Sequence, residues 1–173
     1  MMEITTLRVA YASSSLSMKT LMCRAVTAAN GIQQFEPGNW CETYSTDDPR
    51  FTALGYLYKT AVHLYALLSL PLQLAIHFAE SQVEGPITRA LARDGHCLIQ
   101  LGRLTLAWPT AVLGVAVAGN EEQRSQYAVW LEELKWSGQV DGAVIMAPML
   151  EEFWKSGKTE WDECWYERVA CVG

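Results

Sequence analysis

Residues 52–70, TALGYLYKTAVHLYALLSL, indicate the fold class of this chain. Their apolar side chains recur every three or four positions, which is the spacing of one face of an α-helix. Pro71 follows directly, and it either starts a second helix in its first turn or kinks the first one. The segment therefore predicts a long helix. Its apolar stripe consists of Leu54, Leu57, Ala61, Leu64 and Leu68.

The chain before this segment divides into a predicted helix and a predicted loop. Residues 14–29 have helical spacing, and the Asn-Gly pair at 30–31 supplies a stop signal. Residues 32–51 are rich in Pro, Gly and Asp. We expect them to form an ordered loop anchored by Trp40 and Tyr44, or alternatively a mobile lid.

Helical spacing continues towards the C-terminus. Asn120 and Gln123 stand at the positions of a reciprocal helix N-cap, and the segment that follows is amphipathic. Its inward face is expected to hold Tyr127, Trp130, Leu131 and Leu134. In the segment after Pro71, the expected core face holds Leu72, Ile76, Ala79 and Val83. Further helices are expected at residues 72–83, 86–106, 108–118, 121–137, 141–155 and 159–165.

These patterns predict an all-α fold. No run of five or more residues alternates between apolar and polar with a period of two, so a β-sheet is not expected. A length of 173 residues suits one domain with a sizeable core. We therefore expect a compact single-domain bundle of about seven to eight helices over residues 1–173. Residues 1–51 would form an N-terminal helix and a loop or lid, and residues 52–166 the main helical region.

The composition excludes some classes of partner. The chain is 50% hydrophobic and 18% charged, so either much of it is buried or apolar surface serves a partner, a pocket or a membrane. The net charge of −6 and the lack of a basic cluster argue against direct nucleic-acid binding. Residues 61–79 are interrupted by polar side chains and residues 104–119 are too short for a membrane span, so both are expected to be core helices.

The cysteines and histidines predict no metal site. The five cysteines are scattered without a CxxC pair, which fits neither a zinc site nor a disulfide framework. The three histidines lack the spacing of metal ligands. Motifs for cofactor binding and for activated nucleophiles are also missing from the sequence, so no cofactor is expected. Because no secretion signal is seen, reduced thiols in the cytosol or nucleus are the simplest interpretation.

Asp94 is a carboxylate within an apolar stripe. The helix expected after Pro86 places it among buried side chains, and burying an unpaired carboxylate is costly. Asp94 is therefore a candidate general acid or base, or a ligand anchor, in an apolar pocket. The alternative is a structural Asp that bonds to a helix end or to an Arg, or a local break at Gly95.

Three polar side chains of the 52–70 helix are further catalytic candidates, namely Tyr56, His63 and Tyr65. His63 lies with Tyr56 and Lys59 on one side of this helix, and a polar cluster on a mostly buried helix can line a pocket. One placed donor can polarise a carbonyl group of a substrate. The alternative for His63 is a core position in which a backbone carbonyl satisfies the imidazole.

Aromatic and sulfur-containing side chains supply a candidate substrate-binding lining. Thioether and aromatic groups suit an apolar ligand, although core packing explains such residues more often. The candidates are Trp108, Cys97, Met146, Met149, Phe153 and Trp130.

Three segments carry a resemblance to a known family: ALGYLYKTAVHLYALL (53–68), LAWPTAVLGVAVAGNEEQR (106–124) and MLEEFWKSGKTEWDECW (149–165). In this order they resemble the C-terminal part of the regulatory, ligand-sensing domain of fungal zinc-cluster transcription factors. The six closely spaced zinc-binding cysteines and the basic linker of that family are missing from this sequence. The resemblance thus implies a fragment, a regulator that cannot bind DNA, or a stand-alone descendant with another use, and we favour the last.

Two functions follow as expectations. One is a stand-alone, cofactor-free enzyme of fungal secondary metabolism that holds an apolar substrate for cyclisation, isomerisation or a pericyclic reaction. The other is a regulator without DNA binding, which senses a metabolite or dimerises. The enzyme implies an apolar small molecule as substrate, and the regulator implies a metabolite or another transcription factor as partner. A third possibility is a decayed gene product without activity, and the sequence leaves a homodimer open.

Overall fold

The computed structural model describes residues 2–43, 49–79, 106–136 and 141–165. The regular structure within these ranges is entirely helical, which confirms the predicted all-α fold. The helices are α1 (Met2–Ala12), α2 (Met18–Gln34), α3 (Pro37–Thr43), α4 (Pro49–Ser69), α5 (Leu72–Ala75), the 3₁₀ helix η1 (Ile76–Phe78), α8 (Ala107–Ala116), α9 (Glu121–Trp136), α10 (Asp141–Ser156) and α11 (Trp161–Trp165).

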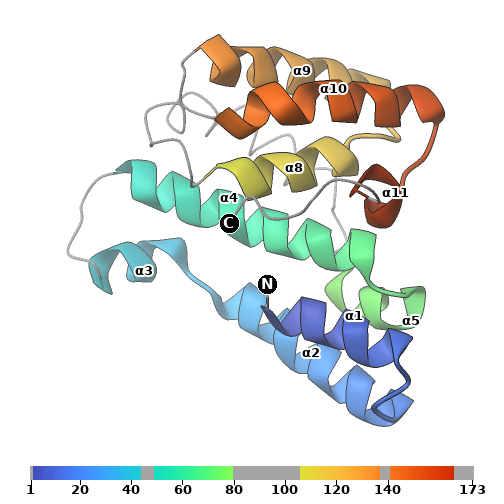
Figure 1. The fold of residues 1–173 in the computed structure, drawn as a ribbon. Helices are drawn as coiled ribbons and strands as arrows, with labels where there is room; N and C mark the ends of the chain where they lie inside the picture. The colour runs from blue at the N-terminus through green and yellow to red at the C-terminus, as the bar shows by residue number, and fades with distance from the viewer. Residues whose placement is uncertain (1, 44–48, 80–105, 137–140, 166–173) are drawn as a thin grey trace.

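The helices stack in layers around α4 (Figure 1). The pair α1–α2 lies on one side of α4, and α8 lies on the other side, with the hairpin α9–α10 outside it. The predicted stripe of α4 faces this core, since Leu54, Leu57 and Ala61 are buried. No helix within the described ranges combines the length and the apolar character that a membrane span requires.

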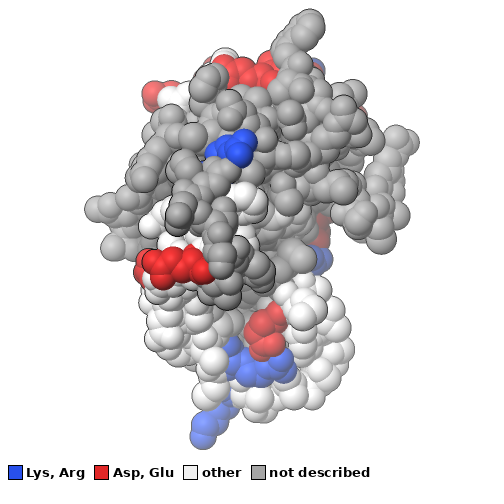
Figure 2. Space-filling view, turned by 90° about the vertical axis from the view of Figure 1, so that its left-hand side faces the viewer, with Lys and Arg blue, Asp and Glu red and all other residues white. Residues whose placement is uncertain are grey.

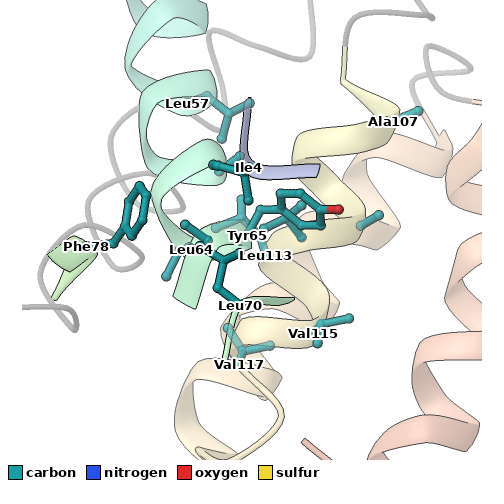
Figure 3. Packing of buried hydrophobic residues seen from close by; sticks show 14 of the residues in the cluster. Ile4, Leu57, Leu64, Tyr65, Leu70, Phe78, Ala107, Leu113, Val115 and Val117 are labelled. Atoms are coloured by element: carbon teal, nitrogen blue, oxygen red, sulfur yellow. The ribbon is translucent and has the colours of Figure 1, made fainter. Parts of the chain in front are cut away.

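Helix α8 is apolar on all sides because it is enclosed by other helices. Its residues from Ala107 to Val115 are buried apart from Trp108, which is part-buried. A helix without a polar face is stable in water only when every face is covered, and α4 and α10 supply that cover. Figure 3 shows Tyr65 of α4 and Leu113 of α8 lying next to each other in this core.

The N-terminal part contains more helix than the sequence predicts. Helix α2 continues through Asn30 and Gly31 to Gln34, and α3 occupies part of the stretch that we expected to be a loop or lid. The predicted stop at residues 30–31 is therefore wrong. The helix continues because Ala29 is buried against the core, and this packing outweighs the weak helix propensity of Asn and Gly.

The segment after Pro71 is helical, but its buried face is not the predicted one. Pro71 starts α5, as one of the two alternatives proposed. Leu72 and Ile76 are 79% and 62% exposed, whereas Leu74 and Phe78 are buried. The prediction for this face is wrong because Leu72 and Ile76 have the same four-residue spacing as Leu74 and Phe78, so spacing alone does not choose between them. Packing of α5 and η1 against α2 and α4 buries the second pair.

The C-terminal helices agree with the predictions. The backbone N–H of Gln123 donates to Asn120 Oδ1 at 3.1 Å, which is the expected N-cap of α9. The predicted inward face of α9 is buried; it comprises Tyr127, Trp130, Leu131 and Leu134. The helix expected at residues 86–106 lies outside the described residues.

Charge is unevenly distributed over the described surface. Figure 2 shows acidic side chains at the top of one face, at the height of α9 and α10 in Figure 1, and Lys or Arg side chains next to an acidic one towards the bottom, at the height of α1 and α2. Among the residues of α9 and α10 whose burial is described, the exposed carboxylates are Glu121, Glu122, Glu132, Glu133, Glu151 and Glu152.

Candidate functional site

The predicted catalytic residues do not form one constellation in the described part of the chain. Asp94 lies outside the described residues, so its role stays a prediction. Tyr56 is 42% exposed, whereas Tyr65 on the same helix is only 6% exposed. His63 is part-buried on α4. Tyr56 and Tyr65 therefore point into different environments.

Tyr65 belongs to a packed aromatic cluster between α4, α8 and α11. Its ring contacts Trp108 edge to face, with centroids 5.8 Å apart, and contacts Trp161 in the same way at 5.1 Å. Trp108 also stacks on Tyr58 at 6.1 Å. Such contacts contribute about 0.5–1.5 kcal/mol each beyond area burial. The structure thus brings Tyr65 and Trp108 together, but as packing partners.

The other predicted substrate-binding residues fill the core between α8, α9 and α10. Met146, Phe153 and Trp130 are buried, and Met149 is part-buried. Trp130 packs edge to face on Tyr127 with centroids 5.7 Å apart. None of these side chains lines the hollow between α1, α2 and α4 or the hollow between α9 and α10. Cys97 lies outside the described residues.

Tyr127 shows how polar atoms are satisfied in this core. Its hydroxyl donates to the backbone carbonyl of Thr110 at 2.8 Å. Burial raises the pKa of Tyr127 well above its ordinary value, so the phenol keeps its proton. Trp154 Nε1 donates to the carbonyl of Gly114 at 2.9 Å. Both bonds fasten the outer hairpin to the backbone of α8.

A hollow of about 330 Å³ lies between α1, α2 and α4, and we name it the N-terminal cavity. Most of its lining is apolar, and the residues come from segments that are far apart in the sequence. The lining consists of Glu3, Ile4, Ala28, Gly31, Ile32, Phe35, Tyr58, Lys59 and Val62.

Lys59 is held in a fixed position at this cavity. Its Nζ donates to the backbone carbonyls of Gln33 at 2.9 Å and of Phe35 at 2.8 Å. These carbonyls lie at the C-terminal end of α2, where the helix dipole favours a cation. An ammonium group has three N–H donors, so these two bonds leave one donor for another acceptor.

The acidic group at the cavity already has a cationic partner. Arg24 Nε and Nη2 contact Glu3 Oε1 at 2.8 Å and 2.7 Å, which joins α1 to α2. Tyr58 is part-buried beside Lys59, and burial raises the pKa of its phenol. The cavity therefore combines apolar walls, a neutral phenol and one fixed ammonium group.

The sequence contains one signal for this site. Lys59 is the only Asp, Glu, Lys or Arg residue within the apolar helix segment 53–68. Sequence reasoning noted it beside Tyr56 and His63 but did not select it, and it missed Tyr58 and Gly31. Its two carbonyl partners belong to α2, and no local pattern predicts which helix end will reach it.

No metal site is seen among the described residues, where no three His, Cys, Asp or Glu side chains gather closely enough to hold an ion. Comparisons of the chain with known protein families, with curated proteins and with solved structures give no match. The resemblance to the regulatory domain of zinc-cluster transcription factors therefore stays a prediction from the sequence.

Proposed function

We propose that this protein binds a small, mostly apolar molecule in the N-terminal cavity and that Lys59 contacts one oxygen atom of that molecule. The observation that carries the proposal is the fixed ammonium group at the edge of an apolar hollow. The volume of about 330 Å³ falls at the lower end of the range of small-molecule sites.

Lys59 is suited to bind one oxygen atom of a ligand. Because two of its donors are already bonded to α2, the side chain loses little conformational entropy when a ligand binds. A charge-assisted hydrogen bond from its third donor to a carboxylate or carbonyl oxygen contributes about 1.5–3 kcal/mol. Ligand specificity would thus come from one oxygen atom and from the shape of the apolar remainder.

A cofactor-free cyclisation or isomerisation extends this proposal. An apolar cavity can hold a flexible substrate in a reactive conformer, and positioning alone can lower a barrier by several kcal/mol. Lys59 would polarise a carbonyl oxygen of the substrate, and Tyr58 would hold a proton close to it. Under this proposal Asp94 stays a predicted general acid or base, and His63 stays a predicted donor to a carbonyl group.

Ligand sensing by a regulator is the second candidate function. It is favoured by the fact that Lys59 bonds to the end of α2. A ligand that competes for this ammonium group would release the carbonyls of Gln33 and Phe35. Hydrogen exchange of residues 31–36 should then become faster when ligand is added, whereas simple binding for catalysis would leave this exchange unchanged or slower.

Gly31 offers a direct test of the binding site. A Cβ placed on Gly31 meets no atom within 4 Å, although this residue lines the cavity. Gly31→Leu should therefore fill the cavity without a clash, and Leu is also the better helix former. Gly38→Leu on α3 is the matched control, because its Cβ also meets no atom within 4 Å and it lies outside the lining.

Octanoate and 1-octanol are suitable probes, since they share an apolar chain and differ in the carboxylate. Isothermal titration should show that octanoate binds to the wild type and to Gly38→Leu, and at least about ten-fold more weakly to Gly31→Leu. Equal octanoate binding by both leucine variants, or no binding to the wild type, would contradict the proposal.

A further inference from the structure

Helices α9 and α10 form the outer layer of the molecule (Figure 1). A second hollow lies between these two helices. We name it the hairpin groove, and its volume is about 360 Å³. Its walls come from one face of each helix and combine an indole ring with charged groups of both signs. The lining consists of Glu121, Arg124, Ser125, Ala128, Glu151, Trp154 and Lys155.

Arg124 is the unusual residue of this groove. It is part-buried, and its Nε atom is covered by protein without a hydrogen-bond acceptor among the described residues. Within the described ranges its guanidinium group also forms no ion pair, although Glu121 and Glu151 line the same groove. The covered Nε loses its hydration without gaining an acceptor, which is costly for stability. The two terminal nitrogens of the guanidinium group are not among the covered atoms, so they are the donors that an anion from outside the chain can reach.

The wall opposite this charge is rigid. Trp154 is fixed by its Nε1 bond to the carbonyl of Gly114 and by an edge-to-face contact with Tyr127, at a centroid separation of 5.9 Å. Because these two contacts already fix the indole ring, Trp154 loses little conformational entropy when a planar ligand packs against it. Lys155 and Glu151 are exposed and 4.0 Å apart. Because solvent screens an exposed charge, Lys155 attracts a ligand anion only weakly, and the part-buried Arg124 is the main anchor.

We propose that the hairpin groove binds a planar molecule with a single carboxylate, which accepts hydrogen bonds from the Arg124 guanidinium group while its plane lies against Trp154. The planar fork of an arginine matches the two oxygens of a carboxylate. Glu121 and Glu151 favour a monoanion, because a dianion such as phosphate meets stronger repulsion from both glutamates. This site is separate from the N-terminal cavity, and neither proposal depends on the other.

The test uses three probes: 2-naphthoate, its neutral analogue 2-naphthamide, and inorganic phosphate. Naphthoate titrations of the Gly31→Leu chain, whose N-terminal cavity is filled, report on the hairpin groove alone, and the affinity found there should also be present in the wild type. The amide and phosphate should bind at least about ten-fold more weakly than naphthoate. In NMR spectra, naphthoate should shift the Arg124 Nε–Hε signal, which is identified by its loss in Arg124→Met.

Two methionine variants of the same groove separate a binding role from a structural one. Arg124→Met keeps the aliphatic packing and should weaken naphthoate binding roughly ten- to a hundred-fold without lowering the midpoint of thermal unfolding. Lys155→Met, the matched control, should bind within about two-fold of the wild type. If Arg124→Met lowers the unfolding midpoint, Arg124→Gln replaces it in the binding test.

Three results would overturn the proposal. The first is equal binding of naphthamide, which would show that the carboxylate is not recognised. The second is phosphate binding at Arg124 as tight as that of naphthoate. The third is naphthoate binding that stays at wild-type strength without the guanidinium group, or that is not saturable in the wild type.

Discussion

Gly114 of α8 lies directly against the side chain of Leu150 in α10. A Cβ placed on Gly114 would lie 2.5 Å from Leu150 Cδ1, which is closer than van der Waals contact allows. The two helices therefore approach each other as closely as they do because position 114 has no side chain. The carbonyl of the same residue accepts the hydrogen bond from Trp154, so this one position fixes both the distance and the orientation of the outer hairpin.

Gly114→Ala should lower the free energy of unfolding by about 1–3 kcal/mol, because the added methyl group overpacks the α8–α10 contact. Urea denaturation measures this change. The matched control is Gly119→Ala, whose Cβ meets no atom within 4 Å. Stability of Gly114→Ala equal to that of the control would show that α10 moves away freely.

Lys59→Met should lower the free energy of unfolding by about 0.5–1.5 kcal/mol, because the carbonyls of Gln33 and Phe35 lose their shared donor. It should also weaken octanoate binding while leaving 1-octanol binding nearly unchanged, which titration can measure. Lys19→Met on the exposed side of α2 is the control. An equal loss of affinity for both probes would contradict a contact between Lys59 and an oxygen of the ligand.

The contribution of Tyr127 to the free energy of unfolding should decrease at alkaline pH. Burial raises its pKa above the ordinary value of 10.0, so the unfolded chain releases this proton at a lower pH than the folded protein does. The stabilisation is complete below about pH 10 and decreases as the pH rises further. Urea titrations of the wild type and Tyr127→Phe at several pH values should show a smaller alkaline decrease for the variant.

Tyr127→Phe should also cost about 1–2 kcal/mol near neutral pH, since the buried bond to the Thr110 carbonyl is lost. Tyr11→Phe, on the part-buried rim of α1, is a control with the same chemical change. Parallel alkaline curves for the wild type and Tyr127→Phe would be inconsistent with a phenol that stays protonated in the fold.

The described cysteines should differ in their reactivity. Burial raises the pKa of the Cys164 thiol to about 12, and the thiolate is the nucleophile in alkylation, so Cys164 should react slowly at pH 8. Cys41 should also react slowly because it is buried, whereas the exposed Cys23 should react first. Peptide mapping after timed alkylation gives this order, and labelling of Cys164 as fast as Cys23 would contradict it.

Much of the fold could be predicted because its signals are local. The stripe of α4, the all-round apolar α8 and the N-cap at Asn120 depend on spacings of three or four residues, and the structure has all of them. The face of α5 was predicted wrongly, because two apolar pairs share the same four-residue spacing and only packing against α2 and α4 decides which pair is buried. The end of α2 was predicted too early, because its continuation depends on packing against another helix.

Candidate binding residues were harder to predict for a related reason. Aromatic and methionine side chains on helix faces look the same in the sequence whether they line a cavity or fill a core. In the structure Trp130, Met146 and Phe153 are buried, and Trp108 packs against the catalytic candidate Tyr65. Their roles at a ligand site stay predictions. Lys59 stood out in the sequence only by its charge within an apolar segment.

The sequence by itself therefore determined that this is an all-α protein, and it placed most helices and their inward faces. Helical periodicity is a relationship between neighbours along the chain, so it can be read without the fold. Only the tertiary structure decided where the hollows lie and which groups face them. The bond between Lys59 and the end of α2, and the guanidinium group of Arg124 beside Trp154, arise where segments distant along the chain pack together.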